Sequence, residues 1–370
     1  MKFTLSTKPL IAAANLVIVN SNISKFDHKS FMLQITATET NLILNTESNS
    51  ILSEVKLLGV GEDIQENTRM FVDAAIFKQL ISTLKSSQVE LSFTDGALVV
   101  TSGKSSFSLP KVADASDGAF RSPAALSAED IASAGIVDIS KWKYIKEHQL
   151  YARAETYTNP VYTYVWVGAN GDVLVGDMDN SIFTHSKAGQ LSTNCLIKNT
   201  MINLLTSLPD ETKLIQRDET YVLHIDADSY EYRSQIFPVI ESDKNGNYNA
   251  DLIMGIMELG PDAVKVDCGE IITTINQSAL LNSDKDPLLE FNMKSDGLHI
   301  KDRRVDAVIA IDGDVSEPYT LMFKPQLLRS FLSSCPDSTI YICPRINDGS
   351  VVGIIVHTKD YAAVLGGEDV

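Results

Sequence analysis

Apolar residues recur at helical spacing in three segments of the chain that align with one another without a gap. The three segments are 72–84 (VDAAIFKQLISTL), 196–208 (LIKNTMINLLTSL) and 323–335 (FKPQLLRSFLSSC). In the first segment Phe77, Ile81 and Leu84 fall on one helical face, and the other two segments are apolar at the same positions. We therefore predict one amphipathic helix in each segment, and hence a module that the chain uses three times.

Short segments of alternating apolar and polar residues follow each of these helices. They are 88–93, 97–102 and 105–109 after the first helix, 213–216, 221–227 and 230–237 after the second, and 339–345, 351–358 and 361–366 after the third. Asp95-Gly96 and Asp348-Gly349 lie between neighbouring segments, and Asp-Gly turns match the twist of an antiparallel hairpin. Each module is therefore predicted to end as a helix followed by three antiparallel strands.

A weaker version of the same order precedes each of these helices. Helix-like apolar runs at 5–17, 126–137 and 266–281 are followed by strand pairs at 30–47, 163–177 and 288–302. Two helices and several antiparallel strands per module predict an α+β fold with three similar domains. Polar, turn-rich linkers at 110–123 and 241–251 place these domains at 1–118, 119–255 and 256–370.

The charge balance limits how this chain could meet nucleic acid. The formal net charge is −17, so the chain cannot coat DNA by bulk attraction, and any contact with phosphate must be local. Cys195, Cys268, Cys335 and Cys343 form no C-x-x-C pair and sit in or beside apolar stretches, which is typical of reduced structural cysteines. The sequence contains no apolar run long enough to span a membrane and no recognisable leader, so we expect a cytoplasmic protein.

The sequence offers little that supports catalysis. Gly103-Lys104-Ser105 ends like a phosphate-binding loop, but Leu98 stands where that loop needs its first glycine. The six histidines are scattered without metal-ligand spacing. A carboxylate-based hydrolase that uses Asp312 and Asp314 is an alternative, although both lie in a turn where Asp is common. We expect no enzyme activity, no cofactor and no bound metal.

Several stretches of the chain together resemble one protein family. They are the opening MKFTLS, the run 70–84 (MFVDAAIFKQLISTL), the block 98–109 (LVVTSGKSSFSL) and the threefold repeat. In this order they cover the whole length and are similar to the bacterial-type DNA sliding clamp, the beta subunit of DNA polymerase III, in a bacterial or a phage-encoded form.

This resemblance implies a function in DNA replication. Two protomers of three domains would close head to tail into a homodimeric ring, with helices lining the hole and sheets outside. The ring would encircle double-stranded DNA without reading its sequence and would tether a replicative DNA polymerase, with a clamp loader as a further partner. A ring or assembly protein that never loads onto DNA is the other alternative.

The resemblance also assigns residues to three sites. The protomer contact would use one hydrophobic pair at each end of the chain, Phe107 with Leu109 and Leu280 with Leu281. All four could instead be core residues of their own domains. Cations on exposed helix faces would approach the DNA phosphates: Lys8, Lys25, Lys78, Lys85, Lys141, Lys143, Lys146, Lys198, Lys324 and Arg329. A pocket for a partner peptide would be formed by Asp177, Asn180, Ser181, Ile182, Val364 and Leu365.

The sequence departs from the family pattern at two of these sites. Ala75 stands where the family usually has a pore-lining arginine, and the run 266–281 carries no cation. We therefore expect topological enclosure to contribute most of the retention on DNA. In the pocket, 179–182 (DNSI) replaces the usual Gly-His-Arg-Leu, which predicts partners with a peptide motif of their own. Ile182, Val364 and Leu365 could also be plain core residues.

Overall fold

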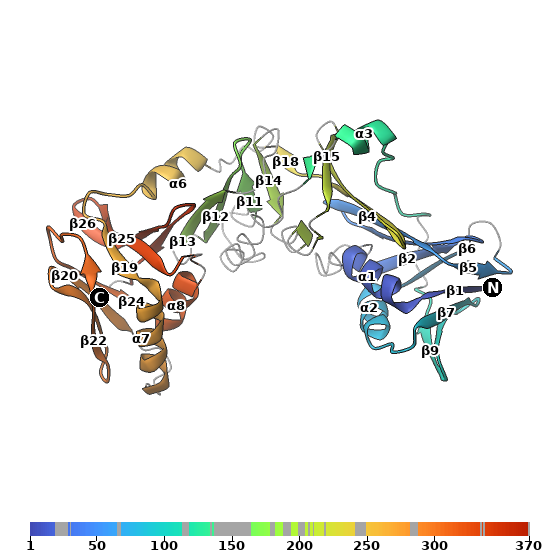
Figure 1. Cartoon of the computed structure of the whole chain (residues 1–370), viewed down its shortest axis with the longest axis horizontal. Helices are drawn as coiled ribbons and strands as arrows, with labels where there is room; N and C mark the ends of the chain where they lie inside the picture. The colour runs from blue at the N-terminus through green and yellow to red at the C-terminus, as the bar shows by residue number, and fades with distance from the viewer. Residues whose placement is uncertain are drawn as a thin grey trace. The chain divides into compact units, whose positions relative to one another are not determined.

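The computed structural model divides the chain into two compact units, whose elements are labelled in Figure 1. Unit 1 consists of Met1–Ile139 and Thr200–Val239, and unit 2 consists of Ser140–Asn199 and Ile240–Val370. The structure describes residues 1–18, 29, 31–64, 68–112, 118–133, 135–136, 164–177, 182–187, 194–198, 204–205, 208–209, 211–217, 220–240, 249–281, 288–333, 335 and 337–368.

Unit 1 contains a five-stranded and an eight-stranded antiparallel sheet. The first has the order β5 (Val60–Glu62), β1 (Lys2–Ser6), β7 (Gln88–Phe93), β8 (Ala97–Ser102), β9 (Ser105–Pro110). The second has the order β10 (Gly135–Ile136), β15 (Lys213–Arg217), β16 (Thr220–Ala227), β17 (Tyr230–Ile236), β4 (Ile51–Leu58), β3 (Asn41–Glu47), β2 (Met32–Ala37), β6 (Thr68–Asp73). Helices α1 (Thr7–Val17) and α2 (Ala74–Ser82) pack side by side, and the short α3 (Ala128–Ser133) lies against β15 (Figure 1).

Unit 2 is also built from two antiparallel sheets and a helix pair. The ten-stranded sheet has the order β18 (Val239–Ile240), β14 (Cys195–Lys198), β11 (Tyr164–Val167), β12 (Asp172–Asp177), β13 (Ile182–Lys187), β27 (Tyr361–Gly366), β26 (Ser350–His357), β25 (Thr339–Asn347), β19 (Val264–Asp267), β23 (Ile311–Asp312). The four-stranded sheet has the order β22 (Asp306–Ile309), β21 (Gly297–Lys301), β20 (Leu289–Lys294), β24 (Tyr319–Phe323). Helices α7 (Cys268–Leu281) and α8 (Pro325–Ser333) contact each other, and α6 (Ala250–Ile256) precedes β19.

The first and third copies of the repeated helix are confirmed as α2 and α8. Phe77 and Ile81 of α2 are fully buried, as are Leu328 and Leu332 at the equivalent positions of α8. Burying a side chain of this size contributes about 1.5–3 kcal/mol, so the apolar stripe is what holds each helix against its sheet. Asp73 caps α2, because its carboxylate accepts a hydrogen bond of 2.8 Å from the Ile76 backbone N–H.

The predicted hairpins are confirmed, because their turns are encoded locally. Asp348 and Gly349 both have positive φ, 48° and 78°, which is the geometry of the tight turn that joins β25 and β26. Gly171 and Gly297 also have positive φ, in the turns between β11 and β12 and between β20 and β21. Glycine has no Cβ and adopts this conformation at little cost, so these positions could be read directly from the sequence.

Two predicted helices are wrong in part. Cys195–Lys198 form strand β14, in which Leu196 pairs with Trp166 of β11, so the second repeated helix does not begin at Leu196; Leu204 and Leu205 are helical. Apolar pairs look the same in a buried strand and at a helix start, which explains the error. The run 126–137 is interrupted after α3, because Gly135 begins β10 and pairs with Leu214 of β15.

Residues of the predicted middle domain contribute strands to both units. In unit 1, β17 pairs with β4 from Ile236 opposite Ile51 to Tyr230 opposite Leu57, so β15–β17 extend the sheet that β2, β3 and β4 begin. In unit 2, β13 pairs with β27 in the same way, so β11–β14 extend the sheet of the C-terminal strands. The domain boundaries at 118/119 and 255/256 stay a prediction.

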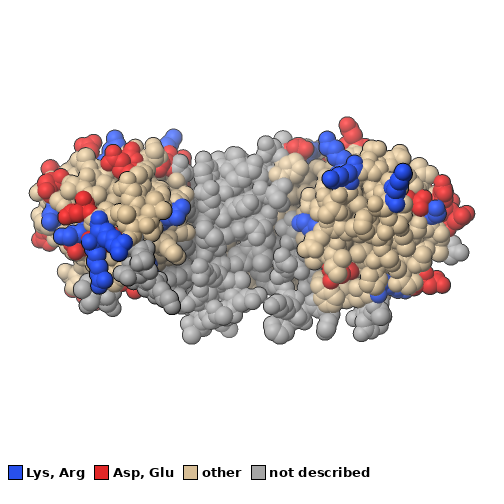
Figure 2. All heavy atoms as spheres, turned by 90° about the horizontal axis from the view of Figure 1, so that it is seen from below, with Lys and Arg blue, Asp and Glu red and all other residues tan. Residues whose placement is uncertain are grey.

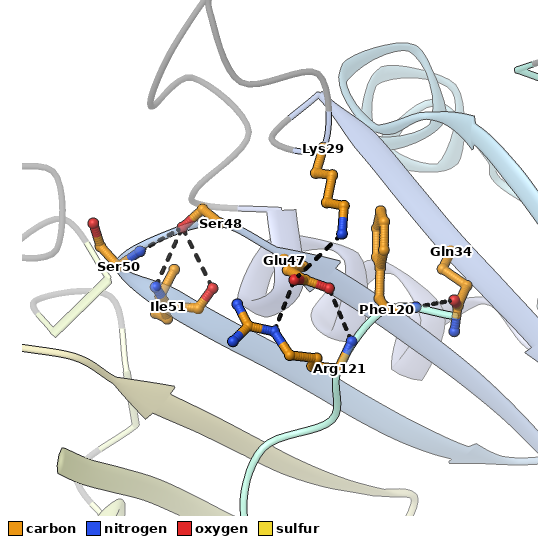
Figure 3. Close-up of polar contacts among 8 residues, drawn as sticks. All are labelled: Lys29, Gln34, Glu47, Ser48, Ser50, Ile51, Phe120 and Arg121. Carbon is orange, nitrogen blue, oxygen red and sulfur yellow. Dashed lines mark hydrogen bonds and ion pairs between the residues drawn. The ribbon is translucent and has the colours of Figure 1, made fainter. Parts of the chain in front are cut away.

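The segment 118–124, here called the strap, lies across the eight-stranded sheet of unit 1 (Figure 3). The Phe120 ring packs edge-on against Phe71 with centroids 5.1 Å apart, and the Phe120 backbone N–H donates to Gln34 Oε1 at 2.7 Å. Arg121 donates to the buried Glu47 carboxylate twice, from its backbone N–H at 2.9 Å and from Nε at 2.8 Å. Lys29 Nζ lies 3.6 Å from the same carboxylate.

A second buried carboxylate joins the strap to β17. Glu54 accepts a hydrogen bond of 3.0 Å from Asn45 Nδ2, forms an ion pair with Arg233 of β17, and accepts a hydrogen bond from Ser122 of the strap. The Ala124 backbone N–H then donates to Gln235 Oε1 of β17 at 2.9 Å. The strap is therefore hydrogen-bonded to side chains from β2 to β17, on both sides of the place where β4 pairs with β17.

The environment of Glu54 makes the stability of unit 1 sensitive to acid. Burial alone would raise the pKa of Glu54, but the Ser122 hydrogen bond, the Arg233 charge and Asn45 outweigh it and lower the pKa below the ordinary value of 4.5. Glu47 behaves in the same way. Burial raises its pKa, but the hydrogen bonds and charge of Arg121 and the charge of Lys29 outweigh burial, so the pKa of Glu47 is also lowered below 4.5. A carboxyl group with a lowered folded-state pKa stabilises the fold above pH 4.5 and loses that contribution as the pH falls through the folded-state value.

We predict that Glu54→Gln lowers the free energy of unfolding at pH 7 by about 3 kcal/mol, because Arg233 loses its partner in a largely buried site. Stability should also fall less steeply between pH 5 and about pH 3 than in the unsubstituted protein. Urea unfolding at several pH values measures both effects. The exposed Glu62→Gln is the control, and equal acid dependence in all three proteins would contradict this role of Glu54.

A second prediction concerns the close pairing of β26 with β27. A Cβ on Gly353 would lie 2.3 Å from the Leu365 carbonyl oxygen, so Gly353→Ala should force the strands apart and cost about 2 kcal/mol or more. Gly96→Ala is the matched control, because nothing lies within 4 Å of its Cβ position. Thermal unfolding distinguishes the two variants, and equal melting temperatures would refute the packing argument.

Candidate subunit contact and nucleic-acid surface

The residues assigned to the first half of the protomer contact lie on an edge strand. β9 is the last strand of its sheet, and of its six residues only Leu109 is buried. Phe107 is 40% exposed, although it projects to the same strand face as Leu109. Phe107 is therefore a surface residue beside unpaired backbone groups, whereas Leu109 belongs to the core.

The residues assigned to the second half are exposed at the end of a helix. Leu280 is 86% and Leu281 is 49% exposed, so the alternative that they are core residues is wrong for both. Nearby, β22 is the edge of the four-stranded sheet, and its Val308 is 56% exposed. Val308 was not among the contact residues predicted from the sequence, although a short apolar strand after a polar turn is a signal that could have indicated it.

A tight turn holds the end of α7 in place. The Ser278 hydroxyl of α7, which is buried, donates to Asp302 Oδ2, and Arg304 donates from Nη1 to the Leu281 carbonyl oxygen. Asp302 Oδ1 also accepts 2.6 Å hydrogen bonds from the backbone N–H groups of Arg304 and Val305. The turn from β21 to β22 thus satisfies the carbonyl of the last helical residue, Leu281, and holds the end of α7 that carries Leu280 and Leu281.

Only some of the cations that were predicted to contact DNA lie on exposed helix surfaces. Lys8 of α1 and Arg329 of α8 are exposed, and Lys78 of α2 is half-buried, which lowers the pKa of its ammonium group. Lys85 lies beyond the end of α2, and Lys198 ends strand β14, so the prediction that these two lie on helices is wrong. The chain leaves the helix at Thr83 in the first case and pairs with β11 in the second.

The remaining cations add little to a continuous basic surface. Lys324 lies just before α8 and forms an ion pair of 3.2 Å with Glu368. Lys25, Lys141, Lys143 and Lys146 lie outside the described residues. Ala75 is exposed on α2, and α7 carries no cation. On the face drawn in Figure 2, the described Lys and Arg side chains stand in small separate groups and form no single band.

The residues assigned to the peptide pocket are brought together in two paired strands. Ile182 of β13 lies opposite Leu365 of β27, and Phe183 lies opposite Val364. Ile182 and Leu365 therefore project to one face of the sheet and Val364 to the other, and all three are fully buried. Asp177 ends β12, while Asn180 and Ser181 lie outside the described residues.

The geometry gives no support to a carboxylate-based hydrolase or to a phosphate-binding loop. Asp312 and Asp314 are both exposed at a turn, and Gly103-Lys104 forms the turn between β8 and β9. Among the described residues, no group of three or more His, Cys, Asp or Glu side chains could hold a metal ion. Within the same part of the chain, no helix is both long and apolar enough to cross a membrane.

With these antiparallel sheets and helix pairs, the chain has the fold of the bacterial DNA polymerase III beta sliding clamps. The chain is similar over its full length to the beta sliding clamp of Caulobacter crescentus (TM-score 0.75, 14% identity, 99% of that chain). It is also similar over its full length to the DNA polymerase sliding clamp of Bacillus subtilis (TM-score 0.72, 14% identity, 99% of that chain).

A third similar structure is the Helicobacter pylori beta clamp bound to a DNA ligase peptide (TM-score 0.70, 13% identity, 100% of both chains). No protein-family model matches the sequence, and no curated relative matches it either. The resemblance found in the sequence is therefore confirmed as a likeness of fold.

We predict that Asp302→Ala loosens the end of α7, because Ser278 and the turn backbone lose their common acceptor. Hydrogen exchange of the backbone amides of residues 278–281 should become about tenfold faster. Asp306→Ala is the control, since its ion pair with Lys301 is exposed and 4.0 Å long. Unchanged exchange in Asp302→Ala would show that the turn does not hold the helix.

Proposed function

We propose that this chain is a sliding clamp, a processivity factor that encircles duplex DNA as a head-to-tail homodimer and tethers a replicative polymerase. The observation that carries this proposal is the pair of exposed apolar edges, β9 with Phe107 and β22 with Val308 beside Leu280 and Leu281, on a chain with the clamp fold over its full length. Such edges are aggregation-prone unless a partner strand covers them.

The contact that we propose joins unlike surfaces of two copies. β9 of one protomer would pair with β22 of its partner, and Phe107 would pack against the leucines at the end of α7. A heterologous contact of this kind closes into a ring when the rotation between copies divides a full turn, and two copies suffice. Apolar side chains beside paired backbone groups give such a contact both specificity and affinity.

The DNA contact would be weak and independent of sequence. Lys8, Lys78 and Arg329 would approach phosphates, and phosphate contacts carry no sequence information. A chain with net charge −17, an exposed Ala75 and a cation-free α7 cannot depend on attraction alone. Retention would come from enclosure, in the cytoplasm of a bacterium or of a phage-infected cell.

The clamp would recruit its polymerase and its loader through a short peptide, held at the surface over β13 and β27. The similar Helicobacter pylori clamp binds a DNA ligase peptide, which supports this mode of recruitment. Ile182 and Leu365 are buried on one face of the sheet, so they would form the floor beneath such a peptide, and Asp177, Asn180 and Ser181 would border it. Val364 projects to the opposite face and would support the floor from the core.

The test combines the mass in solution with retention on DNA. The unsubstituted protein should be a dimer by light scattering, and it should stay on circular plasmid through gel filtration and leave when the plasmid is cut once. Leu280→Asp with Leu281→Asp should give folded monomers that are lost from both DNA forms, because two buried charges oppose the apolar contact.

Leu252→Asp is the matched control, because this α6 leucine is 59% exposed and lies outside the proposed contact. It should remain dimeric and retained on circles. Unaltered dimers in the Leu280, Leu281 variant would contradict the assigned contact. Dimers of the unsubstituted protein that never persist on circular DNA would favour an assembly protein over a clamp, in line with the sparse cations.

A further inference from the structure

Two cysteines that lie far apart in the sequence meet where α7 begins and α8 ends. Cys268 is the first residue of α7, and its backbone N–H donates to the Ser338 carbonyl oxygen at 2.7 Å. Cys335 follows α8, and its backbone N–H donates to the Leu332 carbonyl oxygen at 3.1 Å. The Cys268 Sγ lies 3.5 Å from that same Leu332 oxygen, so both cysteines contact one backbone carbonyl group near the end of α8.

The two thiols are in direct contact and differ in exposure. Their side chains hydrogen-bond to each other, and Cys335 Sγ also donates to the Phe331 carbonyl oxygen at 3.8 Å. Cys268 is buried, whereas Cys335 is partly exposed. Cys335 is therefore the member of the pair that lies nearer to solvent.

The environment favours a reactive thiolate at Cys268 more than at the other cysteines. The hydrogen bond from Cys335 lowers the pKa of Cys268, against the opposing effects of burial and of Asp267. The N-terminus of α7 acts in the same direction, because helix N-termini stabilise negative charge. By contrast, burial raises the pKa of Cys195 to about 12 and also raises the pKa of Cys343, so these two thiols should be inert.

We propose that Cys268 and Cys335 form a modification site, a dithiol that a hydroperoxide converts into a disulfide between α7 and α8. With hydrogen peroxide, the Cys268 thiolate attacks one peroxide oxygen, the O–O bond breaks, and a sulfenic acid and hydroxide form. The Cys335 sulfur then attacks the Cys268 sulfur, the S–O bond breaks and water leaves. In sum, two thiols and one peroxide give one disulfide and two waters.

The disulfide would add a covalent link between two helices that packing and weak thiol hydrogen bonds already hold together. It would close a long loop that contains α7, β20–β24 and α8, and long loops gain most from such a link in the chain-entropy model. A reductant such as dithiothreitol would reverse the change. The site is independent of the proposed clamp function, because neither cysteine belongs to the contact or the DNA surface.

The test is peptide mapping of the whole reduced protein after treatment with hydrogen peroxide and alkylation of the remaining thiols. We expect a linked pair of tryptic peptides, one with Cys268 and one with Cys335, lighter by two hydrogens than the sum of the two peptides with only Cys343 alkylated. Fragmentation assigns the bond to Cys335 and not to Cys343 in the same peptide. The oxidised protein should melt about 5 °C or more higher, and dithiothreitol should restore the original melting temperature.

Single substitutions provide the controls. Cys268→Ser should leave Cys335 free and alkylated after peroxide, whereas Cys195→Ser should still form the linked peptides. Alkylation of both Cys268 and Cys335 in peroxide-treated unsubstituted protein would overturn the proposal, as would overoxidation of one with the other free. Because the mapping of the unsubstituted protein is decisive, the proposal is testable even where Cys268→Ser fails to fold.

Discussion

The backbone ladder between β4 and β17 is the constraint on which the rest of unit 1 depends. It joins a strand near the N-terminus to one from the middle of the chain, and the Ser53 and Ser234 hydroxyls, both fully buried, meet across it at 3.0 Å. A slip of one residue would turn every side chain of β17 to the opposite face and would separate these hydroxyls, so the register is strongly specified. The β13–β27 ladder plays the same part in unit 2. The middle segment is thereby fused to a terminal segment within each unit, which is a stiffer connection than a flexible linker.

The strap explains how unit 1 tolerates buried carboxylates at this joint. An isolated ionised group in such a place would be costly, but Glu47 and Glu54 each face an arginine and further hydrogen-bond donors. Their charges therefore help to position the strap, because Arg121 bonds to Glu47 and the next residue, Ser122, bonds to Glu54. The apolar contact of Phe120 with Phe71 fixes one end of the strap and the Gln235 contact fixes the other. Pairing of strands and pairing of charges thus specify the same arrangement.

Local signals in the sequence predicted much of this fold, whereas signals that depend on distant partners did not. Turns such as Asp348-Gly349 need only their own φ angles, and the apolar stripes of α2 and α8 need only their own periodicity. The strand at Cys195–Lys198 exists because β11 lies beside it, which no local pattern reveals. For the candidate sites, alternation placed Phe107 and Leu109 on one face but could not show that only Leu109 is covered. Ile182 and Val364 read equally well as pocket or as core, since burial depends on the pairing of β13 with β27.

The net charge limits which forces can hold the proposed contacts together. Two copies of a chain with charge −17 repel each other over distances of about 10 Å at ordinary salt, and both repel DNA. Association must therefore rely on short-range terms, and exposed apolar groups on edge strands provide them. Arg303 and Arg304 lie in the turn after β21, and Arg304 donates to the Leu281 carbonyl oxygen, so positive charge lies beside the proposed contact. In the proposed ring, enclosure would solve the corresponding problem for DNA, because a closed ring holds a duplex that its surface barely attracts. A net charge of −17 would then be compatible with tight retention on DNA and would leave the proposed ring free to move along the duplex.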